Sequence, residues 1–266
     1  MIPFFVSKYI DFEKQYSSII LLQVLIVQAL IFKTDTPSKM HTPTDGSKAD
    51  LAIAKLHYGV QMLQNKNYHN AAALFKDGLA IAKDCDFGTT SIASNPGKWV
   101  CFVHPQECQP LNYDTADCFI FQSPIVVSDT KDMVGPSGQL LTSIIVYNLA
   151  LTYHLGAAHI KPSEYIFRKA LGCYQLAHNL QHQSNDMDNE FGELLRMAIA
   201  NNIGHIHWMA GNDTKATQCF QHLLKTIMYL LNCGCWTSII LNHPFLEGFL
   251  HNCQRWILLA QPSPAA

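Results

Sequence analysis

The chain has 266 residues, of which 48% are hydrophobic and 14% are charged, so it holds enough apolar material for a core in one elongated or two compact domains. The 18 Lys and Arg residues nearly balance the 20 Asp and Glu residues, for a formal net charge of −2. Nucleic-acid-binding domains usually carry a basic surface, so this balance argues against a nucleic-acid partner. The nine cysteines mostly stand alone in apolar stretches, which favours a reducing compartment, and we expect a cytoplasmic protein.

The N-terminal part contains one long apolar run, residues 17–32, with the sequence SSIILLQVLIVQALIF. A helix of this length spans about 24 Å, short of a hydrocarbon core of about 30 Å. Residues 1–33 are therefore interpreted as an apolar N-terminal helix, either a capping helix or a signal anchor. Only residues 17–32 could bring the chain to a membrane, which leaves membrane anchoring as the alternative localisation. Residues 34–48 are rich in Pro, Ser and Thr and are typical of a linker.

Helical periodicity begins after this linker. In residues 49–86, apolar side chains recur at helical spacing on both sides of a polar break, QNKNYHN, which predicts two helices joined by a short turn. The same pattern of two apolar-periodic stretches recurs in residues 139–184, where the second helix starts after Pro162. It recurs again in residues 185–234, where GND forms the turn. Residues 235–260 predict a C-terminal capping helix, and residues 261–266 form a Pro/Ala tail.

Small and aromatic residues recur in matching order in the three helical hairpins, and the pattern resembles the tetratricopeptide repeat family. The matching residues are Gly59, Met62, Ala71 and Phe75; Ala150, Tyr153, Ala170 and Tyr174; and Gly204, His207, Ala216 and Phe220. The middle hairpin carries an eight-residue insertion between its two alanines. We expect Gly59, Ala150 and Gly204 to let paired helices approach closely while the aromatic ring fills the adjacent space. The resemblance implies an all-α superhelix, a TPR-like solenoid of stacked hairpins.

Between the first and second hairpins, residues 87–138 have a different composition. KWVCFVHPQ and DCFIFQSPIVVSD are rich in β-branched and aromatic residues and predict a short β-hairpin-like insertion. This insertion also holds the cluster most similar to a metal site, which is Cys101, His104, Cys108 and Cys118. The cluster lacks a CxxC pair, so strand packing is preferred, and a zinc-binding or enzymatic protein is the alternative.

The remaining candidates for chemistry are weak. His205 and His207 are two residues apart and point about 200° apart on a helix, so they cannot share a metal ion. His178 and His182 share a helix face but lack the neighbouring glutamate of the metalloprotease pattern. No nucleophile elbow, phosphate-binding glycine loop or dinucleotide fingerprint is present in the sequence. We therefore expect a non-catalytic protein without a cofactor or bound metal.

The resemblance implies that the first helix of each pair lines a concave groove for a peptide or partner helix. Carried over to this chain, the groove residues are Lys55, Tyr147, Asn148, Leu151, His154, Asn201, Asn202, His205 and Trp208, with Leu56, Val60 and Leu63 beside Lys55. Asn148 and Asn202 occupy equivalent places, and side-chain amides there can both donate to and accept from a peptide backbone. The alternative reading makes these asparagines local helix caps. The expected function is a scaffold or adaptor that binds a neutral or partly apolar peptide, or a membrane-tethered form of it.

Overall fold

The computed structural model describes residues 45–84, 101–103, 118–127, 138–160, 163–183, 190–233 and 244–259. All of them belong to one compact unit, Asp45–Ala266. The predicted N-terminal helix and most of the linker lie outside the described residues. Most of the predicted insertion at residues 87–138 also lies outside them.

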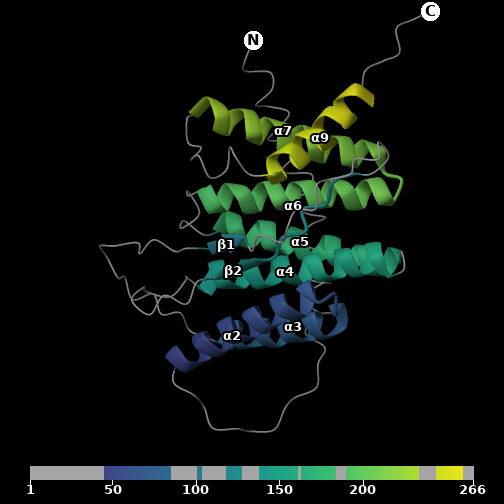
Figure 1. The fold of residues 1–266 in the computed structure, drawn as a ribbon. Coiled ribbons are helices and arrows are strands. Elements are labelled where there is room, and N and C mark those ends of the chain that lie inside the picture. Colours follow the sequence, from purple (N-terminus) through teal and green to yellow (C-terminus); the bar gives the residue numbers. More distant parts are fainter. Residues whose placement is uncertain are drawn as a thin grey trace, which may run out of the picture. The chain divides into compact units, whose positions relative to one another are not determined.

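The described residues are mostly helical, which confirms the predicted all-α character. In chain order the elements are α2 (Asp45–Gln64), α3 (Tyr68–Asp84), β1 (Cys101–Val103), β2 (Ile125–Val127), α4 (Gly138–His159), α5 (Glu164–Gln183), α6 (Glu190–Met209), α7 (Asp213–Cys233) and α9 (Pro244–Leu259). Figure 1 shows the helices following one another as pairs, with the two short strands beside α4.

Each helix packs chiefly against its sequence neighbours. The most extensive contacts are within the pairs α2–α3, α4–α5 and α6–α7, and α3 also packs on α4. Contacts between α5 and α6 are fewer, and α9 covers α7 and touches α6. Consecutive helices therefore bury one another's apolar faces, as the three predicted hairpins require.

The close approach predicted at two of the three small residues is confirmed. A Cβ atom added at Gly59 would lie 2.5 Å from Cε1 of Phe75, and one at Gly204 would lie 2.8 Å from the Phe220 ring. Both phenylalanines are fully buried. Ala150 is also fully buried on α4. A larger residue at either glycine would have to displace a packed aromatic ring, so these two hairpin seams depend on the missing side chain.

The turns of the first and third pairs have the same hydrogen-bonding pattern. In the first pair, Lys66 N–H donates to the Leu63 carbonyl and Asn67 N–H donates to the Met62 carbonyl. In the third pair, Gly211 N–H donates to the Trp208 carbonyl and Asn212 N–H donates to the His207 carbonyl. Lys66 and Gly211 have φ of 57° and 69°, the left-handed conformation of a helix C-terminal cap. Asn67 and Asn212 then accept the N–H three residues on with their side chains, as N-cap residues do. The first and third hairpins therefore turn by the same backbone geometry.

The eight-residue insertion in the middle pair is distributed over the whole hairpin tip. Relative to the other two pairs, it adds four residues to the end of α4, one to the turn and three to the start of α5. The added turn of α4 brings Gly156 and His159 against Tyr68 at the start of α3, where the Tyr68 and His159 rings stack with centroids 6.5 Å apart. The insertion thus lengthens both helices and adds a contact between the end of α4 and the start of α3.

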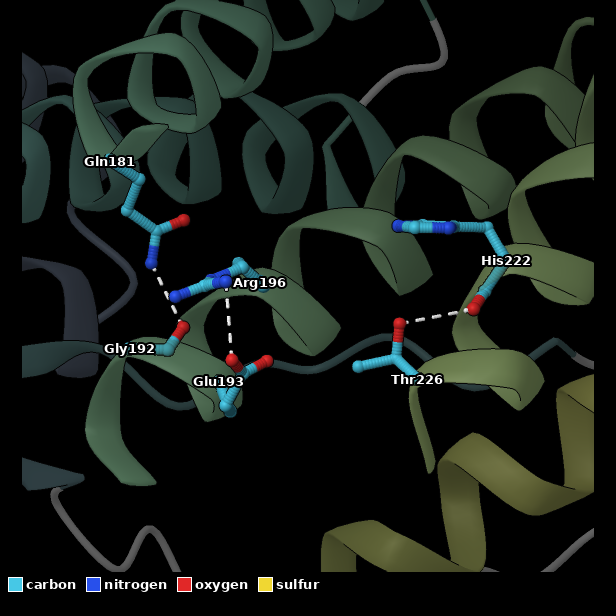
Figure 2. Close-up of polar contacts among 6 residues, drawn as sticks. All are labelled: Gln181, Gly192, Glu193, Arg196, His222 and Thr226. Carbon is cyan, nitrogen blue, oxygen red and sulfur yellow. Dashed lines mark hydrogen bonds and ion pairs between the residues drawn. The ribbon is translucent and has the colours of Figure 1, made fainter. Parts of the chain in front are cut away.

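A polar contact joins the second and third pairs at the point where α5 gives way to α6. Figure 2 shows Gln181 of α5 donating through Nε2 to the Gly192 carbonyl at a distance of 2.9 Å. One turn further along α6, Arg196 pairs with Glu193 at 3.1 Å, and on α7 the Thr226 hydroxyl donates to the His222 carbonyl. Of these three contacts, the one from Gln181 joins two helices, whereas the Arg196–Glu193 pair lies within α6 and the Thr226 bond lies within α7. The Arg196–Glu193 pair is spaced i,i+3 and stabilises α6 itself.

The two strands form one antiparallel pair, with Cys101 opposite Val127 and Val103 opposite Ile125. Strand β2 contacts both α2 and α4. Among the described helices, α4 is long and apolar enough to span a membrane by length and composition, and 89% of that apolar window is buried inside the protein. A buried core helix meets the same criterion.

Candidate functional site

The most unusual feature of the described residues is an extended segment, Cys118–Val127, that lies along the first helices of the pairs. We call it the resident segment. Its last three residues are β2, and its main chain passes in turn by α9, α6, α4 and α2. Phe121, Ile125 and Val127 are almost completely buried, whereas Gln122 is exposed. The segment therefore fills the surface that the sequence analysis assigned to a peptide.

Asn148 of α4 holds one residue of the resident segment by both of its main-chain polar groups. Its Oδ1 accepts from the Ile125 N–H at 2.9 Å, and its Nδ2 donates to the Ile125 carbonyl at 2.6 Å. In an extended chain the N–H and C=O of one residue point to the same side, so one carboxamide can satisfy both. Asn148 thus takes the place that a neighbouring strand would occupy.

Asn202 of α6 repeats this arrangement with Phe121. Its Oδ1 accepts from the Phe121 N–H at 2.9 Å and its Nδ2 donates to the Phe121 carbonyl at 3.0 Å. Asn148 and Asn202 lie two residues before Ala150 and Gly204, respectively, so they occupy the same place in two repeats. Both are in mid-helix and fully buried, which rules out the alternative of local helix caps.

A third asparagine, Asn252 of α9, holds Phe119 in the same way, with both distances 2.8 Å. Asn201 reinforces this contact, because its Nδ2 also donates to the Phe119 carbonyl and its Oδ1 accepts from Asn252 at 2.7 Å. We call Asn148, Asn202 and Asn252 the asparagine ladder. All three are fully buried.

The contacts follow a period of two along the resident segment. Between the ladder positions, the Tyr147 hydroxyl donates to the Ser123 carbonyl at 3.4 Å, and beyond them His57 Nε2 donates to the Val127 carbonyl at 2.8 Å. Residues 119, 121, 123, 125 and 127 therefore all turn main-chain groups toward the helices. The intervening Val126 is opposite Phe102 of β1. Helix side chains thus satisfy one edge of an extended chain, as a strand does in a sheet.

Apolar side chains complete the site at the end nearest α9. Phe119 lies over Gly248, where an added Cβ atom would be 2.5 Å from its ring. Phe121 packs edge-on against Phe245, with centroids 5.4 Å apart, and lies 5.6 Å from Phe249. Apart from the Cys118 thiol, which donates to Asn252, the hydrogen bonds contact only the backbone of the segment. The aromatic contacts are therefore where the site can best distinguish one sequence from another.

A buried chain of hydrogen bonds leads from the ladder into the core. Asn202 Nδ2 donates to the Tyr174 hydroxyl at 3.0 Å, which leaves the hydroxyl hydrogen to donate to Nδ1 of His154 at 3.3 Å. His154 Nε2–H can then donate to Nδ1 of His205 at 2.9 Å. This direction of donation requires both imidazoles to be neutral.

The surroundings of the two histidines favour that neutral state. Burial lowers the pKa of His154 well below its usual value, and the nearby His205 and His159 lower it further. Burial also lowers the pKa of His205 to about 4. In this tautomer, a proton added at Nδ1 of His205 would face the His154 N–H, so the direction of donation described here holds while both rings are uncharged.

The structure brings most of the predicted groove residues together, but beneath the resident segment. Tyr147, Asn148, Asn201 and Asn202 contact that segment. Leu151, His154 and His205 are buried among the helices, with His154 and His205 in contact with each other. Trp208 is half-buried beside His205, and Arg255 lies over its ring at 5.2 Å. The expectation of open groove positions differs from the structure, because these side chains already have a partner within the chain.

Lys55 does not belong to this set. Its Nζ lies 3.4 Å from Asp77 Oδ2 across the α2–α3 pair, and both side chains are substantially exposed. The residue of α2 that reaches the segment is His57, two residues before Gly59, which is the position of Asn148 and Asn202 in their repeats. Alignment of the three repeats could have identified it. Asn252 and the resident segment itself gave no comparable signal, because both lie outside the repeats.

The described cysteines are suited to packing. Burial raises the pKa of Cys173, Cys219 and Cys253 to about 12, so they stay protonated and are weak nucleophiles at neutral pH. Cys118 donates its Sγ hydrogen to Asn252 Oδ1 at 3.2 Å. Within the described residues no group of three or more His, Cys, Asp or Glu side chains could hold a metal ion. His104 and Cys108 of the alternative zinc cluster lie outside those residues.

The geometry therefore defines a buried cradle for an extended chain, made of carboxamides, hydroxyls and aromatic rings. Its buried pair His154 and His205 is neutral, and apart from His57 its other members are amides, tyrosines and apolar side chains. In comparisons with family models, curated proteins and solved structures, nothing matches this chain.

Proposed function

We propose that this protein is a non-catalytic scaffold that binds an extended protein segment on the inner face of a TPR-like solenoid. In this proposal the three helical hairpins stack as divergent tetratricopeptide-like repeats, and residues 87–138 are an insertion that returns to the inner face. One observation carries the proposal. Three buried asparagines on three different helices each take both main-chain groups of one residue in the same extended chain.

The chemistry of the cradle supports binding rather than catalysis. A carboxamide has no proton to exchange near neutral pH and offers one acceptor and two donor hydrogens, which suits a peptide bond. His154 and His205 are buried and bonded to each other, so neither is available as a general base, and His57 donates through Nε2 to the Val127 carbonyl. A neutral cradle also fits a neutral or partly apolar peptide and gives no attraction to a polyanion.

The proposal is tested by selecting peptides from a random 12-residue display library against the full chain. Binders should lose affinity by at least about tenfold in Asn202→Ala combined with Trp208→Ala, since a lost bidentate contact in a desolvated site is worth more than 1.4 kcal/mol. Asn212→Ala is the matched control, because Asn212 is a half-buried turn asparagine whose side chain caps the start of α7. If every selected peptide binds the double variant as tightly as the wild-type chain, the inner face is not the binding surface.

A further inference from the structure

The resident segment indicates the kind of partner that the cradle accepts. We propose that Cys118–Val127 is a built-in competitor for a partner, and that the partner is an extended segment of another protein. This partner segment has two aromatic residues at alternate positions, and β-branched residues four and six positions after the second aromatic residue. This inference rests on the proposed function and adds the partner's chemistry and the competition. The template is the chain's own pattern, with Phe119, Phe121, Ile125 and Val127 as the four anchors.

The first step of the argument concerns what the hydrogen bonds recognise. The ladder, the Tyr147 hydroxyl and His57 all contact main-chain atoms of the segment. A second chain with the same extended conformation would satisfy every one of these groups. Exchange of one chain for the other therefore re-pairs the groups on the helices, and a partner that is extended at the β2 positions can also pair with β1 in place of β2.

The second step concerns the side chains. Phe119 and Phe121 lie on Gly248, Phe245 and Phe249 of α9, whereas the side chain of Gln122 is exposed. Ile125 and Val127, at 0% and 3% exposure, complete the opposite end of the segment. Aromatic rings at alternate positions and β-branched residues further along are thus what a displacing segment must supply. Gly248 leaves room for an aromatic ring at the position of Phe119, because a side chain at residue 248 would occupy the space of that ring.

The third step concerns the tether. The sequence places 33 residues between Asp84 and Cys118, and ten residues between Val127 and Gly138. Ten residues can extend to about 35 Å, so the segment can leave the cradle without unwinding α3 or α4. While tethered, it competes at an effective concentration of about a millimolar or more, which weakens the apparent affinity of any partner in trans.

The experiment measures this competition in the full chain. The probe is a fluorescein-labelled synthetic peptide, DCFIFQSPIVVS, which is the sequence of residues 117–128. In the variant Phe119→Ala with Phe121→Ala, the resident segment loses both aromatic anchors, and we expect the probe to bind at least about 100-fold more tightly than it binds the wild-type chain. The matched control is Ile120→Ala with Gln122→Ala, which should change probe affinity by less than about threefold. A probe in which both phenylalanines are replaced by alanine should not bind either chain.

A second measurement needs no variant of the anchors. In the wild-type chain with a large excess of probe, the amides of residues 119, 121 and 125 should lose protection from hydrogen exchange, while α4 and α6 keep theirs. If the anchor variant is poorly folded, the probe should raise its melting temperature, since a ligand that binds only the folded state stabilises it.

Three outcomes would overturn the inference. The first is that the anchor variant binds the probe no more tightly than the wild-type chain does. The second is that residues 119–125 stay protected from hydrogen exchange at saturating probe. Either result would mean that the segment is a permanent part of the core. Exchange of segments between copies, seen as a concentration-dependent dimer by light scattering, would make a second copy the occupant. The proposed function fails separately, when no library peptide of any sequence binds in a way that depends on Asn202.

Discussion

The hairpin seams and the asparagine ladder both hold helices together, the seams through apolar contacts and the ladder through hydrogen bonds. At the seams a missing side chain faces an aromatic ring, as in Gly59 with Phe75 and Gly204 with Phe220, and the partners are 16 residues apart in both pairs. At the ladder, buried amides bind a segment that is 81 residues from Asn202 and 133 residues from Asn252. The seams are therefore local and apolar, whereas the ladder is polar and joins residues from 23 positions apart, at Asn148, to 133 positions apart, at Asn252.

This difference has an energetic consequence. Loss of apolar contact at a seam costs free energy in proportion to the volume removed, and part of it is recovered when neighbours relax. Loss of one amide at the ladder leaves main-chain groups buried without partners, and no relaxation supplies new ones unless the segment leaves. The seams should therefore determine whether the hairpins fold, and the ladder whether the segment is held.

The largest effect is expected from breaking a seam. Phe75→Ala should lower the free energy of unfolding by about 4 kcal/mol, because it removes a fully buried ring and leaves a cavity. Urea denaturation followed by circular dichroism measures this change. Gly59→Ala should cost less in the Phe75→Ala background than in the wild-type chain, since its Cβ atom would then occupy the vacated space. Equal costs in both backgrounds would mean that the two residues do not share a seam.

The ladder should be nearly as sensitive to a much smaller change in volume. Asn202→Ala leaves the Phe121 N–H and carbonyl unpaired and removes a donor from Tyr174. At about one kcal/mol for each of these three buried groups, the lower end of the usual range, we expect the free energy of unfolding to fall by about 3 kcal/mol. Asn212→Ala, at the exposed turn, should cost only about 1 kcal/mol as a lost helix cap. The comparison is contradicted if the two asparagines cost the same in urea denaturation.

The histidine pair beside the ladder should make the stability depend on pH. Both pKa values are lowered in the folded state, to about 4 for His205, so the unfolded chain takes up protons that the folded chain cannot. Stability is then complete above the unfolded value of about 6.5 and falls as the pH drops toward 4, by about 1.4 kcal/mol per pH unit for each histidine.

His205→Gln tests this contribution, because glutamine keeps a polar side chain beside His154 but does not titrate. The variant should lose about 2 kcal/mol less than the wild-type chain between pH 6.5 and pH 5, at about 1.4 kcal/mol per unit. Denaturation at a series of pH values provides the measurement. Parallel pH profiles for the two chains would exclude His205 as the source.

The smallest effect is expected at Lys55, which the sequence analysis placed in the groove. Its ion pair with Asp77 is exposed, so Lys55→Ala should change the free energy of unfolding by less than about 0.5 kcal/mol. In the Phe119→Ala, Phe121→Ala background, where the resident segment no longer competes, it should leave probe binding unchanged, whereas His57→Ala should weaken it, because His57 contacts the Val127 carbonyl position. A loss of binding in Lys55→Ala would extend the site beyond the ladder.

Much of the helical framework was predictable because its determinants are local. The spacing of Gly59 and Phe75 within one hairpin, and its recurrence in Gly204 and Phe220, reports a contact that two adjacent helices must make. The equivalence of Asn148 and Asn202 could also be read from the repeats, together with their capacity to bind a backbone. His57 was missed because a histidine replaces the asparagine at the same repeat position.

The sequence by itself determined the helix pairs, their close approach and the kind of side chain on their inner face. Only the tertiary structure decided what that face holds, because the resident segment reaches it from residues far along the chain. Side-chain amides that read a backbone carry no information about which backbone they will meet. Which backbone segment they bind depends on chain connectivity and on the aromatic contacts at α9, and neither follows from local periodicity.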